Sequence, residues 1–251
     1  MNALGPTALS AFVRDSVGTF SATLDALDPA SLGAPSTLPG WSRAHVAAHV
    51  DGVGRAIARQ LEYARSGERI EFYDGGQQGR DERIEAGAAL APQELLSRVR
   101  EGLMMLVEAV HDVPADGWDT PTSFRGEGTV ADCVQGAWRE TLIHAADLAG
   151  RSTPADWPTE FAAHLFDFLS ARVPAGTRLV LQPTGRPPVT LGIGANGCVV
   201  TGMETDLAAW LAGREPVGPV RAAASADASE LPALLPWPSA LTPRDAAPQA
   251  G

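Results

Sequence analysis

A carboxylate and an imidazole share one helical face in the stretch WRETLIHAADLAG, residues 138–150. Glu140 and His144 lie four residues apart, a spacing at which side chains on a helix are neighbours. On a helical wheel both fall within the apolar stripe that includes Cys133 and Ala137, so both should face the protein interior. A buried carboxylate is unfavourable unless it is paired or bound to a metal. His144 alone is a modest partner, so Glu140 needs a further one.

A second helix can supply that partner. The predicted helix over residues 42–66 carries its own apolar stripe, with His49 on the flank of the stripe and His45 nearer to solvent. Facing helices of a bundle build metal sites in this way. Two histidines and one glutamate with an open fourth position form a known catalytic zinc arrangement. His49, Glu140 and His144 are therefore candidate metal ligands.

Simpler explanations of these residues stay open. Pairs of the type Glu-x3-His occur often by chance on helix surfaces, and His45, His111 and His164 are further imidazoles in the chain. His111 ends a predicted helix, where a histidine interacts favourably with the helix dipole. His164 lies near Asp167 on another predicted helix, where ordinary side-chain pairing is expected.

The chain offers no strong nucleophile of its own. Cys133 falls in the apolar stripe and is expected to be buried and inert. All 19 basic residues are arginines, which excludes Schiff-base chemistry on lysine. The sequence contains no GxSxG motif, the signature of a nucleophilic serine in hydrolases. A thiol cofactor would fill this gap.

Helical periodicity predicts the elements that must position these residues. We expect bundle helices over residues 7–27, 42–66, 92–111 and 129–150. A glycine-rich loop is expected over residues 73–80, and a fifth helix over residues 158–173. Strands over 177–183, 187–194 and 197–202 and a short helix over 206–213 should follow. The predicted class is α+β, with a four-helix bundle domain over residues 1–152, a small α/β domain over 153–240 and a flexible tail over 241–251.

Composition and charge exclude several classes of partner. The chain has 251 residues and a net charge of -11, so it should repel nucleic acid and anionic membranes. No apolar run approaches the roughly 18 residues that span a bilayer, and the first residues lack the basic region of a signal peptide. Cys133 and Cys198 are far apart and form no CxxC pair, as in a reducing compartment. We expect a cytoplasmic monomer or small homo-oligomer with no nucleic-acid or membrane partner.

Several segments together resemble the mycothiol-dependent maleylpyruvate isomerases. They are LPGWSRAHVAAHV (38–50), YDGGQQGRDERIEAGA (73–88), WRETLIHAADL (138–148) and ETDLAAWLAGREP (204–216). The resemblance covers most of the chain and implies a DinB-like helical bundle that carries a divalent metal, usually Zn2+. It also implies a smaller C-terminal domain similar to the sterol-carrier-protein fold.

The resemblance further implies roles for individual residues. Carried over position by position, the metal ligands are His49, Glu140 and His144, in agreement with the helical wheels. Arg214 matches a family arginine that matters for activity, which implies a catalytic and cofactor-binding role. Its alternative role is to cap the carbonyls at the end of a helix. Arg80 also matches a family arginine, although a loop arginine can simply pair with its acidic neighbours.

The implied reaction is the cis–trans isomerisation of maleylpyruvate to fumarylpyruvate, with zinc and mycothiol as cofactors. A thiolate would add to the double bond, the resulting single bond would rotate, and elimination would give the trans product. Two alternatives are a mycothiol S-transferase that acts on another electrophile and a non-catalytic, metal-bearing binding protein. Segments 73–80 and 112–128 depart from the family pattern and are expected to border the pocket, so the substrate can differ.

Overall fold

The chain forms two compact units in the computed structural model, which describes residues 4–223 and 230–238. Unit 1 comprises Met1–Ser152 and unit 2 comprises Thr153–Gly251. The predicted tail over residues 241–251 lies outside the described residues.

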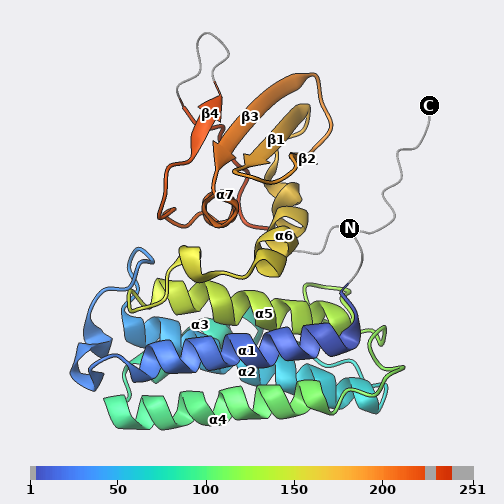
Figure 1. Cartoon of the computed structure of the whole chain (residues 1–251). Coiled ribbons are helices and arrows are strands. Elements are labelled where there is room, and N and C mark those ends of the chain that lie inside the picture. Colours follow the sequence, from blue (N-terminus) through green and yellow to red (C-terminus); the bar gives the residue numbers. More distant parts are fainter. Residues whose placement is uncertain (1–3, 224–229, 239–251) are drawn as a thin grey trace. The chain divides into compact units, whose positions relative to one another are not determined.

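Unit 1 contains the expected bundle of four long helices (Figure 1). They are α1 (Pro6–Asp25), α2 (Arg43–Arg65), α4 (Pro92–His111) and α5 (Val130–Asp147). Helix α1 packs on α5 and α4, and α2 packs on the same two helices, so the four close into a ring. The fully buried side chains inside this ring include Leu9, Phe20, Val46, Ile57, Val99 and Leu103. The metal-ligand candidates therefore come from two adjacent helices, α2 and α5.

Side-chain caps fix where these two helices begin. The Ser42 hydroxyl accepts a hydrogen bond from the backbone N–H of His45 at the start of α2, as the sequence predicts. At the start of α5, Thr129 accepts from the backbone N–H of Asp132, whose carboxylate accepts from the Thr129 N–H in return. Such capping boxes satisfy donors that a helix terminus leaves unpaired. The caps fix the first residue of each helix, and the regular helical geometry then fixes the direction of each later side chain.

The prediction of a glycine-rich loop over residues 73–80 is wrong in its second half. A helix, α3 (Gly76–Ala88), begins at Gly76 and packs on α2. Its N-cap Gly75 is left-handed, with φ of 77°, a conformation that favours glycine. Only Ile84 and Gly87 are buried along α3, so the segment lacks the apolar stripe by which a helix is predicted. A Cβ atom on Gly87 would lie 2.7 Å from the Cβ of Ala48, so this glycine permits the close approach of α3 to α2.

Unit 2 is a small mixed sheet with two helices. The helices are α6 (Thr159–Phe168) and α7 (Glu204–Leu211), and the strands are β1 (Thr177–Pro183), β2 (Val189–Leu191), β3 (Asn196–Gly202) and β4 (Arg221–Ala223). The strand order is β2-β1-β3-β4, with β1 parallel to β3 and the outer strands antiparallel to their neighbours. The α+β class is thus confirmed.

Some predicted boundaries in unit 2 differ from the structure. The α-helix expected over 158–173 ends at Phe168 and continues as a 3-10 turn over Leu169–Arg172. The strand expected over 187–194 shortens to Val189–Leu191 because Gly192 turns the chain at a φ of 71°. Strand β4 was not predicted. Among the described residues, none of the helices combines the length and the hydropathy that a bilayer crossing needs.

Candidate metal centre

Two histidines and one glutamate meet between α2 and α5. The Nε2 atom of His49 lies 2.9 Å from Oε2 of Glu140, and the Nε2 atom of His144 lies 3.2 Å from the same oxygen. The two imidazole rings meet edge to face, with centroids 4.7 Å apart. One ligand atom from each of the three residues lies within 4.8 Å of the others. Glu140 and His144 come from successive turns of α5, and His49 comes from the adjacent helix.

The three side chains differ in their contact with solvent. The side chains of His49 and His144 are 7% and 11% exposed, whereas that of Glu140 is 34% exposed. The cluster therefore has a buried side formed by the imidazoles and an accessible side at the glutamate. A small ligand can approach a bound ion from that side.

Burial and mutual contact set the protonation of the cluster. Burial raises the pKa of Glu140, but its hydrogen bonds with His144 and His49 and their charges outweigh this and hold the pKa well below its usual range. Burial lowers the pKa of His49, and its contact with Glu140 only partly offsets that effect. Burial also lowers the pKa of His144, but hydrogen bonds to Asp147 and Glu140 raise it overall. The anionic carboxylate and the neutral form favoured at His49 suit a metal ligand set, whereas His144 has to lose its proton when it binds an ion.

A second carboxylate orients His144. The Nδ1 atom of His144 lies 2.8 Å from Oδ2 of Asp147, which is 1% exposed. The other oxygen of Asp147 accepts a hydrogen bond of 2.9 Å from the Thr37 hydroxyl, and the Thr37 N–H donates to the backbone carbonyl of Asp147. A histidine that binds a metal through one nitrogen commonly donates its other N–H to a carboxylate in this way. Asp147 belongs to the family-like segment 138–148, although no role is expected for it from the sequence.

His49 has different neighbours. Its ring meets the edge of Trp41, with centroids 5.6 Å apart, and its Nδ1 atom lies 3.3 Å from a guanidinium nitrogen of Arg80. Arg80 also donates a hydrogen bond of 2.7 Å to Asp81. The structure therefore places Arg80 beside the cluster. Arg80 also forms the ion pair with an acidic neighbour that was the alternative expected from the sequence.

Tyr73 is a polar residue near this cluster that the sequence analysis missed. It lines a small hollow together with His49, Arg80 and Ile84. Burial and the charge of Glu140 raise the pKa of Tyr73, while a hydrogen bond with Arg80 acts in the opposite direction. Tyr73 is therefore a neutral hydrogen-bond donor at neutral pH. Its only sequence signal is its place in the family-like segment 73–88.

The donor set fits a divalent cation. Two imidazole nitrogens and one carboxylate oxygen are ligands that zinc accepts, and their mutual distances allow all three to contact one ion. Among the described residues, no other group of three His, Cys, Asp or Glu side chains lies close enough to do this.

The other histidines serve elsewhere. The Nδ1 atom of His45 lies 2.6 Å from the Ser42 hydroxyl in the α2 cap, and its Nε2 atom faces Glu85 at 3.4 Å. His111 is exposed at the last residue of α4. His164 belongs to unit 2, where its ring packs near Phe168.

Cys133 is buried, and burial raises the pKa of its thiol to about 12. Its sulfur lies 3.4 Å from the Thr122 hydroxyl. The thiol is therefore protonated at neutral pH and is a poor nucleophile.

Arg214 lies in unit 2, just beyond the end of α7. Its guanidinium donates a hydrogen bond of 3.0 Å to the carbonyl of Ala212, which is the capping contact that the sequence leaves open. Burial lowers the pKa of Arg172, and the charge of Arg214 lowers it further, so the two arginines lie close together. Paired guanidinium groups form a local positive charge in this unit.

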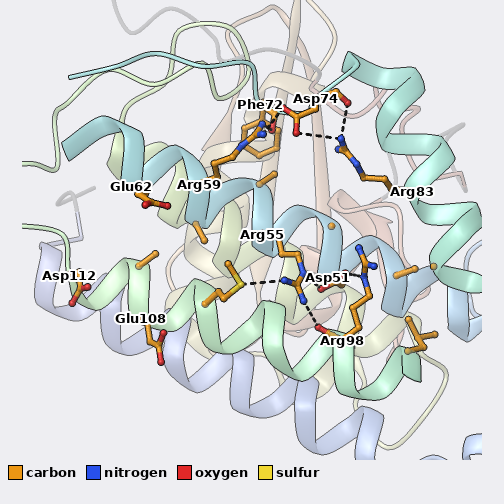
Figure 2. Close-up of a pocket in the computed structure, with 18 of the residues that line it drawn as sticks. Asp51, Arg55, Arg59, Glu62, Phe72, Asp74, Arg83, Arg98, Glu108 and Asp112 are labelled. Carbon is orange, nitrogen blue, oxygen red and sulfur yellow. Dashed lines mark hydrogen bonds and ion pairs between the residues drawn. The ribbon is translucent and has the colours of Figure 1, made fainter. Parts of the chain in front are cut away.

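A larger groove lies between α2 and α4, lined by charged residues (Figure 2). Asp51 at its base is buried, and its two oxygens accept hydrogen bonds from Arg55 at 2.6 Å and Arg98 at 2.7 Å. Gly102 of α4 leaves room for this carboxylate, since a Cβ atom there would lie 2.3 Å from Oδ1 of Asp51. The pair with Arg98 joins α2 to α4, whereas the pair with Arg55 lies within α2. The groove contains none of the three metal-ligand candidates.

Comparisons with known proteins agree across both units. The family model of the mycothiol maleylpyruvate isomerase N-terminal domain matches residues 13–149, and that of the MDMPI C-terminal domain matches residues 156–233. Two solved structures, of the mycothiol-dependent maleylpyruvate isomerase and of a variant with one histidine changed to alanine, each superpose with a TM-score of 0.80 at 25% identity. Each match covers 93% of this chain and 99% of the other. Comparison with curated proteins gave no match.

Proposed function

The chain belongs to the mycothiol maleylpyruvate isomerase family, and from that premise we propose that it is a zinc- and mycothiol-dependent cis–trans isomerase that converts maleylpyruvate to fumarylpyruvate. Family membership confirms the resemblance and the prediction of an enzyme, and it disfavours the non-catalytic alternative. The DinB-like bundle is confirmed by the same matches. The reaction on this chain, the metal and the residue roles are the proposal.

One observation on this chain's own residues supports the proposal. His49, Glu140 and His144 converge with an accessible side at Glu140, inside a family whose solved member is named for its dependence on a thiol. Three protein ligands with an open position are typical of catalytic rather than structural zinc. The Cys133 thiol of unit 1 is buried and protonated, which supports a nucleophile from outside the chain.

The proposed reaction needs a sulfur nucleophile and groups that stabilise the negative charge that develops on the substrate. When bound, the cation and mycothiol would supply a thiolate near neutral pH, and its addition and later loss would let the double bond rotate. The substrate would hold an additional electron pair on a carbonyl oxygen in between, and no proton would be consumed overall. The protein has to stabilise that transient negative charge.

Arg80 and Tyr73 are placed to do so. Both lie at the hollow beside His49, and Tyr73 keeps its proton at neutral pH. We assign them the role of hydrogen-bond donors to the developing enolate oxygen. Arg214 is proposed to bind a carboxylate of the substrate or the cofactor, because a guanidinium pairs with carboxylates through two parallel hydrogen bonds.

A direct assay tests the proposed function. Zinc-loaded protein is mixed with maleylpyruvate, with and without mycothiol, and fumarylpyruvate is followed by chromatography. Turnover only in the presence of mycothiol is the expected result. The matched control is His144→Ala, which should lose the metal and the activity while α5 stays folded.

Two other outcomes reject parts of the proposal. No isomerisation, combined with formation of a mycothiol conjugate from other electrophiles, identifies the S-transferase alternative. Full activity in His144→Ala, or full metal content in that variant, contradicts the assigned ligand set.

A further inference from the structure

The loop over residues 34–42, which leads into α2, is closed by its own hydrogen bonds. Pro35 and Ser42 form an antiparallel bridge across its base. Inside the loop, the N–H and the hydroxyl of Ser36 both donate to the carbonyl of Trp41, at 2.9 Å and 2.8 Å. These contacts fix the backbone of the 34–42 loop and therefore the directions in which its side chains leave.

The same loop contacts both helices of the metal centre. At the end of α5, the Thr37 N–H donates to the backbone carbonyl of Asp147 at 3.0 Å, and the Thr37 hydroxyl donates to Oδ1 of Asp147 at 2.9 Å. On α2, the ring of His49 lies beside that of Trp41, with centroids 5.6 Å apart. The 34–42 loop therefore links the helix that carries His49 to the helix that carries the other two ligand candidates.

The Thr37 hydroxyl is the first member of a row of polar contacts that leads to the ligand set. It occupies Oδ1 of Asp147, and Oδ2 of the same carboxylate lies 2.8 Å from Nδ1 of His144. Because both oxygens are engaged, the carboxylate cannot rotate without losing one of these contacts. A proton on Nδ1 of His144 satisfies the second contact and leaves the lone pair of Nε2 for an ion. That Nε2 atom lies 3.2 Å from Oε2 of Glu140.

Burial decides which member of this row can be altered without disturbing the bundle. The side chain of Asp147 is 1% exposed, so water does not readily replace a contact that it loses. Thr37 lies at the surface, where substitutions usually change stability little. The hydroxyl of Thr37 can therefore be removed while α5 keeps its packing.

We infer that Thr37 is a positioning residue of the metal centre, an inference that rests on the proposed metal ligands. Its hydroxyl fixes the carboxylate of Asp147, and that carboxylate holds His144 with Nε2 toward the ion. Thr37 thus acts through Asp147 rather than by contact with the ion.

A purely structural role of Thr37 requires less of the side chain. Its N–H caps a carbonyl near the end of α5, and any residue other than proline supplies that donor. Replacing the side chain while the N–H stays in place therefore separates the two roles. A structural role predicts an unchanged zinc affinity of the folded protein, whereas a positioning role predicts a loss.

Thr37→Val and Thr37→Ser form the matched pair for this test, on the full chain. Valine has nearly the volume of threonine, so its methyl group keeps water from the place of the lost hydroxyl, whereas serine retains the donor. Zinc affinity is measured by competition with a chromophoric chelator, and circular dichroism follows the helices. We expect Thr37→Val to lower zinc affinity about three- to tenfold, less than the roughly 10- to 100-fold typical of a residue that contacts the bound histidine itself.

Two controls accompany that pair. Thr37→Ser should keep its zinc affinity within about twofold, because the hydrogen bond to Asp147 remains. Thr19→Val removes a hydroxyl that bonds to a backbone carbonyl within α1, and it should leave zinc affinity unchanged.

A double variant tests the route through Asp147. In Asp147→Asn, the Thr37 hydroxyl holds the amide oxygen, so the amide NH2 faces His144. Removing the hydroxyl lets the amide turn its oxygen toward Nδ1 of His144. We therefore expect Thr37→Val to lower the zinc affinity of the unaltered protein but to leave that of Asp147→Asn equal or higher. A threonine that acts independently of Asp147 gives the same fold loss in both proteins.

Three results overturn the inference. They are a zinc affinity of Thr37→Val equal to that of the unaltered protein, an equal loss in Thr37→Ser, and the same fold loss with and without Asp147→Asn. An unaltered protein that binds no zinc overturns the inference together with the ligand set.

The proposed function is judged separately by maleylpyruvate turnover. The expected pattern of zinc affinities in a protein without turnover keeps the role of Thr37 and removes the isomerase assignment. Turnover by a protein whose zinc affinity is unaffected by Thr37→Val does the reverse.

Discussion

Replacing Asp147 by asparagine should weaken zinc binding without unfolding the helix that carries the ligands. One oxygen of Asp147 accepts from the Thr37 hydroxyl at 2.9 Å, and the other faces Nδ1 of His144 at 2.8 Å. In the variant, the amide oxygen keeps the contact with Thr37, so the amide NH2 faces the imidazole. His144 then has to accept at Nδ1 and carry its proton on Nε2, the atom that faces Glu140 and the ion.

The expected loss of zinc affinity follows from this change of the His144 tautomer. Loss of the residue that orients a metal-bound histidine typically lowers metal affinity by about 10- to 100-fold, or about 1.4 to 2.7 kcal/mol. Asp147 is buried, so water does not readily replace the lost contact. We therefore expect a loss of zinc affinity in the upper half of that range. The Asp147 charge also raises the pKa of His144, so its removal reduces competition by protons. That opposing effect becomes smaller as the pH of the measurement is raised, because protons then compete less for the histidine.

Zinc affinity is measured by competition with a chromophoric chelator, and circular dichroism checks that the helices remain. The control is Asp132→Asn on the same helix, which weakens the α5 cap but touches no ligand. The control should keep its zinc affinity and lose about 1 kcal/mol of stability. A folded Asp147→Asn protein with zinc affinity within about twofold of the original would refute the reasoning, since the typical loss is at least tenfold.

Other predictions concern the arginines, the thiols and pH. Arg80→Ala should keep its zinc and lower kcat by about 100-fold. Arg214→Ala should also keep its zinc and lose turnover. Unchanged kinetics in either variant would assign that arginine a structural role only. A disulfide reagent should modify half-exposed Cys198 in the native protein and Cys133 only after unfolding, because burial raises the pKa of Cys133 to about 12; rapid reaction of both thiols contradicts this. Burial lowers the pKa of His144 but its hydrogen bonds raise it overall, so zinc affinity should fall as pH drops through and below neutrality and protons displace the ion. A zinc affinity that is constant from about pH 8 to pH 6 would contradict this assignment.

The bundle could be predicted from the sequence because its long helices carry clear apolar stripes and caps. Ser42 at the start of α2 is an example, since a serine before an apolar periodic run is a local signal. Helix α3 could not be predicted in the same way. It begins with glycines, buries only Ile84 and Gly87, and gains its stability from contact with α2 rather than from its own pattern.

The ligand candidates could be selected from the sequence because a helix fixes directions over short distances. The wheel separates His49 from His45, and the structure buries the former and uses the latter in a cap. Asp147 was missed because an aspartate near a helix end usually faces solvent.

The separation of the ligands along the chain has a consequence for protein lifetime. His49 and Glu140 are 91 residues apart, so an ion held by both closes a long loop, much as a disulfide does. Cross-links over loops of roughly 100 residues are worth on the order of 4 to 5 kcal/mol in the chain-entropy account. Unlike a disulfide, this cross-link comes and goes with the concentration of free metal. Under zinc starvation, we therefore expect unit 1 to unfold and be degraded faster, so that the cell loses the enzyme itself as well as its activity.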